Sequence, residues 1–323
     1  MALVSTPDNP PPPKGVEEAI RAADGVRLRT ARWAAVSPPR GTVAVLCGRG
    51  EFIEKYFEVA SDLIARGFAV AMMDWRGQGR SSRLLRNAKK GHVDDFSDYA
   101  RDLDALVGAV LEPHCPRPWR GLCHSMGAAA LLLAAKAGRC PFDRLVLTSP
   151  MIAIKGIDHH GPKRFLAEGL EALGLGGAFA PRGGGADTLW LGPFAGNVLT
   201  SDRARYARIA AVCAAAPEIW LGGPTIGWVS AAFRAMGRFE APNFAPMITT
   251  PTLIVAAGAD QVVNVAAAER FAARMRTGRI VVIDGAEHEI LIERDLFRDQ
   301  FWAAFDAFIP GSEASPRALA AAL

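Results

Sequence analysis

A serine with the setting of a catalytic nucleophile lies in residues 121–127, which read Gly-Leu-Cys-His-Ser-Met-Gly and precede a run of alanines and leucines. A serine on a sharp turn between a strand and a helix has its hydroxyl lifted above the sheet, where a base and a substrate can reach it. The usual spacing of such a turn is Gly-x-Ser-x-Gly, and Cys123 occupies the place of the first glycine. We therefore predict Ser125 as a nucleophile whose partners come from elsewhere in the chain.

A base and an acid for this serine occur late in the chain. A serine hydroxyl becomes a good nucleophile when a histidine accepts its proton and a carboxylate orients that histidine. His288 follows the last expected strand, whereas His124 adjoins Ser125 and is expected to point away from it. Asp260 follows the preceding expected strand; it could also cap the next helix, and Asp284 is a competing acid. We predict Ser125, Asp260 and His288 as a catalytic triad.

Attack on an ester also needs backbone N–H groups that stabilise the oxyanion. The residue after the nucleophile, Met126, is expected to supply one of them. The second is expected from the loop after the first buried strand, where Arg49 lies between Gly48 and Gly50. Gly50 is the alternative donor, and an ordinary glycine turn is the alternative to both. We predict the backbone N–H groups of Arg49 and Met126 as the oxyanion hole.

Two other segments could be mistaken for a catalytic or a phosphate-binding site. Cys123 precedes the turn by two residues, where a side chain faces the sheet, so we expect a buried and inert thiol. The glycine turn of residues 74–81 lacks the Lys-Ser/Thr ending of a phosphate loop, and we expect it to be structural. Since the sequence also shows no metal-ligand cluster and no dinucleotide fingerprint, we expect neither a metal nor a cofactor.

The elements that must position these residues alternate between buried strands and amphipathic helices. Short apolar runs rich in β-branched residues predict strands, and apolar residues at helical spacing predict helices. The expected strands are 42–47, 68–73, 119–123, 145–147, 252–257 and 279–283, and the expected helices are 53–64, 96–110, 265–275 and 294–308. This alternation predicts an α/β fold with a mostly parallel central sheet flanked by helices.

The alternation of strand and helix patterns stops between residues 151 and 245, which carry glycine clusters and no clear strand pattern. An insertion of this length is too long for an ordinary loop. We predict a largely helical cap, or lid, at 151–245 between two parts of one core at 21–150 and 246–312. A proline-rich arm at 1–20, disordered or extended because four consecutive prolines exclude a helix, and a tail at 313–323 complete the expected organisation.

Composition narrows the class of protein. The net charge of +4 comes from 37 basic and 33 acidic residues spread along the chain, so nucleic-acid binding is not indicated. Five cysteines without C-x-x-C spacing argue against a disulfide framework. The N-terminal residues lack the order of a signal peptide, and no apolar run approaches the ~18 residues of a membrane span. We expect a cytoplasmic protein, with peripheral contact with a membrane surface left open.

With its candidate triad and oxyanion donors, the chain resembles the bacterial lysophospholipases within the monoacylglycerol lipase and serine aminopeptidase group of α/β-hydrolases. The resemblance covers residues ~40–310. The stretches that carry the resemblance most specifically are 74–85, 91–103, 194–206 and 221–228. It implies the α/β-hydrolase fold, hydrolysis of the single acyl ester of a lysophospholipid or monoacylglycerol, and work at the inner face of the membrane without spanning it. It also implies that Glu51 helps to hold the glycerol headgroup. Cys47 and Cys123 depart from the histidine and the glycine that are usual at their positions.

Other functions stay open at this point. A proline-type serine aminopeptidase would need carboxylates of the cap to bind a free amine, and a carboxylesterase for small esters would share the same triad. The candidate carboxylates are Asp158, Glu168, Glu171, Asp187, Asp202, Glu218 and Glu240. A catalytically silent lipid-binding protein of the same fold is less favoured, because such proteins typically lose a triad member and all three are present here.

Overall fold

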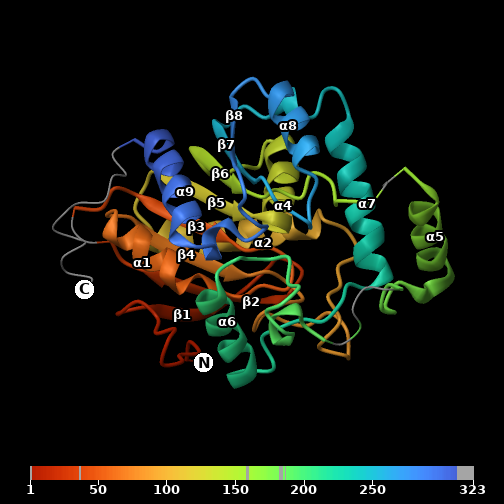
Figure 1. Cartoon of the computed structure of the whole chain (residues 1–323), viewed down its shortest axis with the longest axis horizontal. Coiled ribbons are helices and arrows are strands. Elements are labelled where there is room, and N and C mark those ends of the chain that lie inside the picture. The colour runs from red at the N-terminus through yellow and green to blue at the C-terminus, as the bar shows by residue number, and fades with distance from the viewer. Residues whose placement is uncertain (1, 36–37, 158–159, 182–184, 186, 311–323) are drawn as a thin grey trace.

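One twisted sheet organises the described residues of the computed structural model, which are 2–35, 38–157, 160–181, 185 and 187–310 (Figure 1). These residues form an 8-stranded sheet in the order β1-β2-β4-β3-β5-β6-β7-β8. The strands are β1 (Val16–Arg21), β2 (Arg27–Trp33), β3 (Thr42–Leu46), β4 (Ala69–Asp74), β5 (Trp119–His124), β6 (Arg144–Thr148), β7 (Thr252–Ala257) and β8 (Gly278–Ile283). The pairs β1–β2 and β2–β4 are antiparallel and the other pairs are parallel. The predicted mostly parallel sheet is confirmed.

The burial of each strand follows its place in the sheet. The apolar runs of β3 and β7 are buried along their whole length, as central strands covered on both faces must be. In β8, at the edge of the sheet, only the first and last residues are buried. The fully apolar strands therefore occupy the middle of the sheet.

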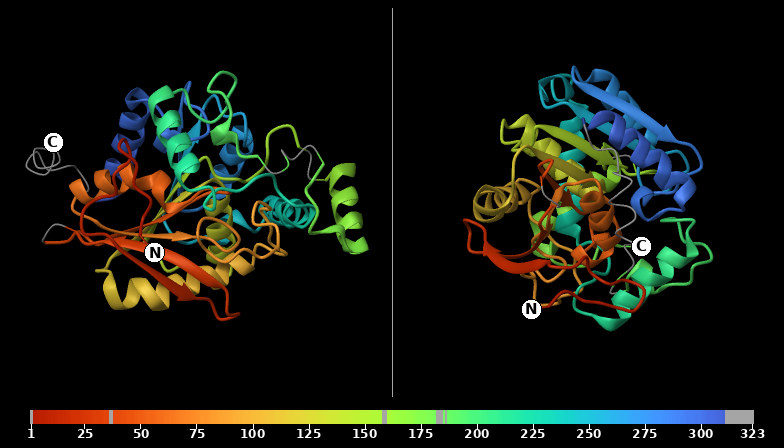
Figure 2. Two further views of the ribbon diagram at one scale, coloured as in Figure 1. Left: turned by 90° about the horizontal axis from the view of Figure 1, so that it is seen from below. Right: turned by 90° about the vertical axis from the view of Figure 1, so that its left-hand side faces the viewer.

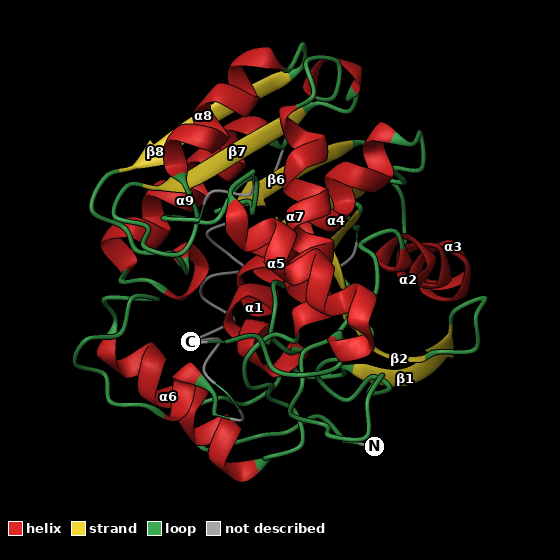
Figure 3. Ribbon diagram, turned by 90° about the vertical axis from the view of Figure 1, so that its right-hand side faces the viewer, coloured by secondary structure: helices red, strands yellow, loops and turns green. Residues whose placement is uncertain are grey.

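Helices cover both faces of this sheet (Figures 2 and 3). The helices outside the insertion are α1 (Phe57–Ala65), α2 (Asp98–Leu106), α3 (Glu112–His114), α4 (Ser125–Lys136), α8 (Val265–Arg274) and α9 (Asp295–Phe308). Helices α1 and α9 lie side by side on one face, where Arg298 of α9 pairs with Asp62 of α1 (Figure 1). Helices α2 and α4 pack against each other on the opposite face. Helix α4, whose first residue is Ser125, is therefore buried over most of its length.

The insertion between β6 and β7 is named here the cap segment, residues 151–245. Its described helices are α5 (Pro162–Leu170), α6 (Arg203–Ala215) and α7 (Ile226–Glu240), with short turns η3 (Glu171–Leu175) and η4 (Leu189–Leu191). Helix α7 packs on the core, whereas α5 stands away from the sheet (Figure 1). No helix in the described ranges has the length and apolar character needed to cross a membrane.

The N-terminal segment differs from the expected arm. Strand β1 begins at Val16, so the expected boundary at residue 20 lies too far along the chain. The preceding residues are also packed against the core: the indole Nε1 of Trp33 donates to the Pro12 carbonyl at 2.9 Å, and Asn9 Nδ2 donates to the Glu54 carbonyl at 2.9 Å. An extended, proline-rich chain keeps its carbonyl groups free to accept hydrogen bonds, and here the Trp33 indole binds the carbonyl of Pro12. The tail expected at 313–323 lies outside the described residues.

Candidate active site

The structure brings Ser125, His288 and Asp260 together at the carboxyl ends of three strands. The Nε2 atom of His288 lies 3.1 Å from Ser125 Oγ, and its Nδ1 atom lies 2.8 Å from Asp260 Oδ2. Ser125 follows β5, Asp260 follows β7 and His288 follows β8. All three side chains are buried. This arrangement has the geometry of a nucleophile, a base and an orienting acid.

The turn at Ser125 is strained, as a nucleophile elbow requires. Ser125 has a φ of 49°, which is uncommon for a residue with a side chain and marks a conformation that the surrounding structure must enforce. A Cβ added to Gly127 would lie 2.5 Å from the Cys47 carbonyl oxygen and 2.6 Å from that of Leu46. The second glycine of the motif is thus needed for close packing between α4 and β3. Cys123, at the place of the first glycine, fits in the core with no exposure, and burial raises the pKa of its thiol well above the usual value.

Asp260 is held as a carboxylate by several donors. Its Oδ1 atom accepts the backbone N–H groups of Val262 at 2.7 Å and Val263 at 2.9 Å, while Oδ2 faces His288. Burial opposes the charged form, but the hydrogen bond and charge of His288 and the two N–H groups outweigh it and lower the pKa of Asp260. The side chain is therefore fixed in position and ionised at neutral pH.

The alternative roles considered for the acids differ from those in the structure. Helix α8 is capped by Asn264, whose side chain accepts the Ala267 N–H, so the expectation that Asp260 caps this helix is wrong. Asp260 instead closes the turn before that cap. Asp284 is exposed, whereas Asp260 contacts His288. The geometry thus favours Asp260 over Asp284 as the partner of His288.

The residues nominated for the oxyanion hole border the same cavity as Ser125. Arg49, Gly50 and Met126 all line it. Met126 is the second residue of α4, and the first N–H groups of a helix have no partner within the helix. Residues 48–50 are named here the oxyanion loop, because the predicted donor Arg49 belongs to them. Gln78 holds this loop: its Nε2 donates to the Gly48 carbonyl at 2.7 Å, and its Oε1 accepts the Gly50 N–H at 3.2 Å.

Gln78 and Ser149 are residues of the site that the sequence did not single out. Gln78 lies in the glycine turn that was expected to be structural, and it shapes the oxyanion loop from there. Ser149 follows β6, has a φ of 41°, and donates its hydroxyl to the His288 carbonyl at 2.8 Å. The only sequence signal for these roles is that each residue follows the carboxyl end of a strand, where the site is built.

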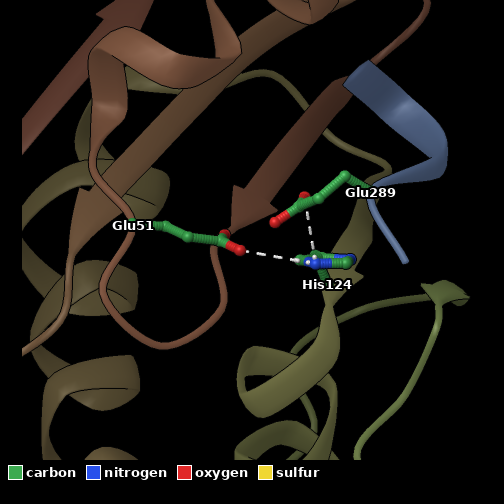
Figure 4. Close-up of side chains that lie close together, drawn as sticks. All are labelled: Glu51, His124 and Glu289. Carbon is green, nitrogen blue, oxygen red and sulfur yellow. Dashed lines mark ion pairs between the residues drawn. The ribbon is translucent and has the colours of Figure 1, made fainter. Parts of the chain in front are cut away.

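The buried side chains of Glu51, His124 and Glu289 lie close together (Figure 4). His124 Nε2 lies 3.3 Å from Glu51 Oε1 and 3.2 Å from Glu289 Oε2. The Lys55 ammonium lies between the same two carboxylates, 3.0 Å from Glu51 and 2.6 Å from Glu289. The four residues, Glu51, Lys55, His124 and Glu289, are named here the ionic cluster. His124 faces this cluster and not Ser125, and its ring centroid lies 4.8 Å from that of His288.

The charges of the ionic cluster stabilise one another. Burial opposes the charged forms of Lys55, His124 and Glu289, but the carboxylates of Glu289 and Glu51 raise the pKa values of Lys55 and His124. Lys55 and His124 in turn lower the pKa of Glu289 well below its usual value. Ligand atoms of Glu51, His124 and Glu289 lie within 4.8 Å of one another, close enough to share a cation, and the Lys55 ammonium already contacts both carboxylates.

Glu51 also binds its own loop. Its carboxylate accepts the Gly48 N–H and the Tyr56 hydroxyl, the latter at 2.6 Å, in addition to its ion pairs with Lys55 and His124. Glu51 lines the cavity as well. The structure thus places it between the oxyanion loop and the ionic cluster, and its predicted contact with a glycerol headgroup stays a prediction.

The cavity over Ser125 has a volume of about 480 Å³ and an apolar wall supplied in part by the cap segment. The cap residues that line it include Leu189, Trp190, Leu221 and Trp228. Pockets of this kind, apolar with a few polar groups, are typical of sites for small organic ligands.

The cap carboxylates that an aminopeptidase would need are mostly engaged elsewhere. The ion pairs are Glu168 with Arg164, Glu171 with Arg234, Asp202 with Arg205, Glu218 with Arg80, and Glu240 with His160. Asp187 lines the cavity, and Asp158 lies outside the described residues. Among the described carboxylates of the cap segment, only Asp187 is thus in a position to bind an amine near Ser125.

The amino-acid sequence is similar to those of known hydrolases of lipid esters. The chain is 38% identical over 297 residues to lysophospholipase L2 of Escherichia coli strain K12, which covers 87% of this chain and 84% of that protein. It is 27% identical to monoacylglycerol lipase of Mycolicibacterium smegmatis, over 86% of this chain and 91% of that one.

A solved structure shares the fold. It is a soluble variant of monoglyceride lipase from Saccharomyces cerevisiae in complex with a substrate analogue, with a TM-score of 0.72 and 19% identity, covering 92% of this chain and 97% of that one. Residues 37–295 match the Hydrolase_4 family, described as serine aminopeptidase, S33. The chain therefore has the α/β-hydrolase fold and belongs to the serine aminopeptidase S33 family of hydrolases.

Proposed function

We propose that this protein hydrolyses the acyl ester of lysophospholipids or monoacylglycerols, with Ser125 as nucleophile, His288 as base and Asp260 as the acid that orients His288. The observation that carries the proposal is the unbroken contact from Ser125 Oγ through the two nitrogens of His288 to Asp260. The named relatives, a lysophospholipase and a monoacylglycerol lipase, support this class of substrate.

The reaction runs in two steps. His288 Nε2 accepts the Ser125 proton as Oγ attacks the ester carbonyl, and the same proton then passes to the departing alcohol, which leaves an acyl-serine. In the second step His288 takes a proton from water, the hydroxide attacks the acyl-serine, and Ser125 recovers its proton as the fatty acid leaves. Asp260, ionised and held by two backbone N–H groups, stabilises the imidazolium formed in each step.

The backbone N–H groups of Arg49 and Met126 are proposed to bind the oxyanion of both steps. The fastening of the oxyanion loop by Gln78 supports this role, because donors act best when they are held in place before the reaction. Each such donor is worth about 3 kcal/mol of the barrier. No cofactor takes part in this sequence of steps.

The cap segment is proposed to cover the acyl chain and to contact a membrane surface. Its described residues include large apolar side chains that are 38–77% exposed, namely Phe165, Leu166, Leu173, Leu175, Leu189, Leu191 and Val198. Such groups in one insertion mark an interaction site, and in α5 two of them lie close to Lys163, which suits an anionic lipid surface. Cosedimentation with phosphatidylglycerol vesicles tests this, and equal binding by a Phe165→Ser/Leu166→Ser variant would contradict it.

The function is tested by assaying the purified protein and its Ser125→Ala variant on lysophospholipids, monoacylglycerols, short aryl esters and proline amides. We expect hydrolysis of the lipid esters and its loss in the variant. Hydrolysis of proline amides alone would establish the aminopeptidase instead, and a preference for short aryl esters would establish a small-ester carboxylesterase. Full activity of the Ser125→Ala variant would refute the mechanism.

A further inference from the structure

Arg49, a residue that lines the active-site cavity, has no carboxylate partner among the described residues. Arg49 lines the cavity together with Ser125 and His288. Its Nη2 atom donates to the Gly222 carbonyl at 2.8 Å, and its guanidinium carbon lies 5.2 Å from the centre of the Trp228 ring. Its Nε atom is buried and has no hydrogen-bond partner among the described residues.

The charge of this guanidinium is not neutralised within the described part of the chain. The carboxylates of Glu51 and Glu289, which line the same cavity, pair with Lys55, and no ion pair joins Asp187 to Arg49. Burial lowers the pKa of Arg49 to about 10, so the side chain is still a cation at neutral pH. A buried cation without an anion is unfavourable, and a bound anion would offset that cost.

The chain makes room for the guanidinium. A Cβ added to Gly91 would lie 2.4 Å from Arg49 Nη2, so a larger residue at that position would displace the side chain. Gly91 is itself hydrogen-bonded to Gly223, in the cap segment next to the carbonyl that holds Arg49. The guanidinium is therefore held at a defined place between the core and the cap segment.

We propose that the Arg49 side chain binds the phosphate of a lysophospholipid whose ester lies at Ser125. The proposal rests on the function proposed above and selects, between its two substrate classes, the one that carries a phosphate. Arginine suits this role because its N–H groups form a fork that matches phosphate oxygens.

The covalent reach is also appropriate. In a 1-acyl glycerophospholipid, as many bonds separate the ester carbonyl carbon from the phosphorus as separate the backbone nitrogen of Arg49 from its guanidinium carbon. One residue can thus place its backbone N–H at the oxyanion and its side chain at the phosphate.

The test compares two substrates with the same acyl chain, a lysophosphatidylglycerol and a monoacylglycerol, each below its micelle concentration. The ratio of their kcat/KM values is measured for the wild type, Arg49→Met and Arg49→Lys. We expect Arg49→Met to lower the ratio at least tenfold, equivalent to about 1.4 kcal/mol, and Arg49→Lys to lower it less because the charge is kept.

The matched control is Arg83→Met. Arg83 is likewise held by backbone carbonyls, those of Gly77 and Glu218, but it does not line the cavity. This variant is expected to keep the wild-type ratio.

Equal losses on both substrates in Arg49→Met would overturn the proposal and leave Arg49 as a structural residue of the oxyanion loop. An unchanged ratio in Arg49→Met would also overturn the proposal. If inorganic phosphate then inhibits the wild type but not Arg49→Met, the Arg49 side chain binds a free anion and not the phosphate of the substrate. Absence of activity on both substrates in the wild type would refute the proposed function itself, which is a different outcome from either of these.

Discussion

Replacing Lys55 with methionine would leave the ionic cluster with two carboxylates and one cation. Lys55 is fully buried and contacts Glu51 and Glu289, and methionine keeps most of its volume without its charge. The cation that still contacts both carboxylates is His124, whose pKa these two groups raise. The perturbation is therefore the loss of one charge at a buried site.

The expected cost follows from that burial. Removing one partner of a buried ion pair typically destabilises a protein by 3–5 kcal/mol, because the other charge is left uncompensated. The Glu289→Gln variant should cost a similar amount for the opposite reason, an excess of positive charge. The double variant Lys55→Met/Glu289→Gln restores the balance, so its cost should fall at least about 2 kcal/mol below the sum of the two single costs.

Urea denaturation followed by circular dichroism measures these free energies of unfolding, and the matched control is the exposed pair of Arg80 and Glu218. The Glu218 side chain is 55% exposed, so Arg80→Met and Glu218→Gln should each cost less than about 1 kcal/mol and show little coupling. A cost below about 1 kcal/mol for Lys55→Met, or additive costs in the double variant, would refute the view that the cluster is a charge-balanced unit.

Three further predictions concern Gln78, Gly127 and Glu58. Gln78→Met removes the side-chain hydrogen bonds of the oxyanion loop and should lower kcat about tenfold with little effect on the midpoint of urea unfolding; an unchanged kcat would contradict this. Gly127→Ala places a Cβ against the Cys47 carbonyl and should lower both the melting temperature and kcat, whereas a variant with wild-type values would show that α4 can shift freely.

The third concerns pH. Glu58 is three-quarters buried, and against that burial Arg205 and two other arginines lower its pKa from 4.5 to about 2. A depressed pKa contributes stability that is present above pH 4.5 and lost as the pH falls towards 2, here about 3 kcal/mol. Glu58→Gln should flatten the pH dependence of unfolding in that window, and an unaltered slope would contradict the assignment.

The order of strands and helices made much of this structure accessible from the sequence. Parallel strands bring their carboxyl ends to one edge of the sheet, so residues after the β5, β7 and β8 stretches had to lie near one another. Ser125, Asp260 and His288 follow those three strands, and the structure places them in contact. The expectation needed only the element order and the chemistry of serine, histidine and aspartate.

The supporting residues could not be found in this way. Gln78 binds a loop about 30 positions earlier in the chain, and Ser149 binds the carbonyl of His288, so their partners are known only once the fold is known. Lys55 sits in a segment with helical spacing, where a lysine is ordinarily solvated. The packing of Pro12 against Trp33 is hidden for the same reason, since a proline run excludes a helix without indicating what the extended chain contacts.

The ionic cluster explains why His288 pairs with one carboxylate, that of Asp260, although other carboxylates lie close to it. Glu289 follows His288 in the chain and is buried beside it, and an unbalanced charge there would compete with Asp260 for the imidazolium. Lys55 and His124 neutralise Glu289 and Glu51, whereas the Asp260 carboxylate is held by backbone N–H groups and has no cation besides His288 among its described contacts. The Lys155 ammonium binds the backbone carbonyl of Asp260 and not its carboxylate. His124 is thereby also kept from acting as a base for its neighbour Ser125, because its Nε2 faces the carboxylates. In the proposed mechanism, the charge that develops on His288 is then met by the single carboxylate that lies against its Nδ1.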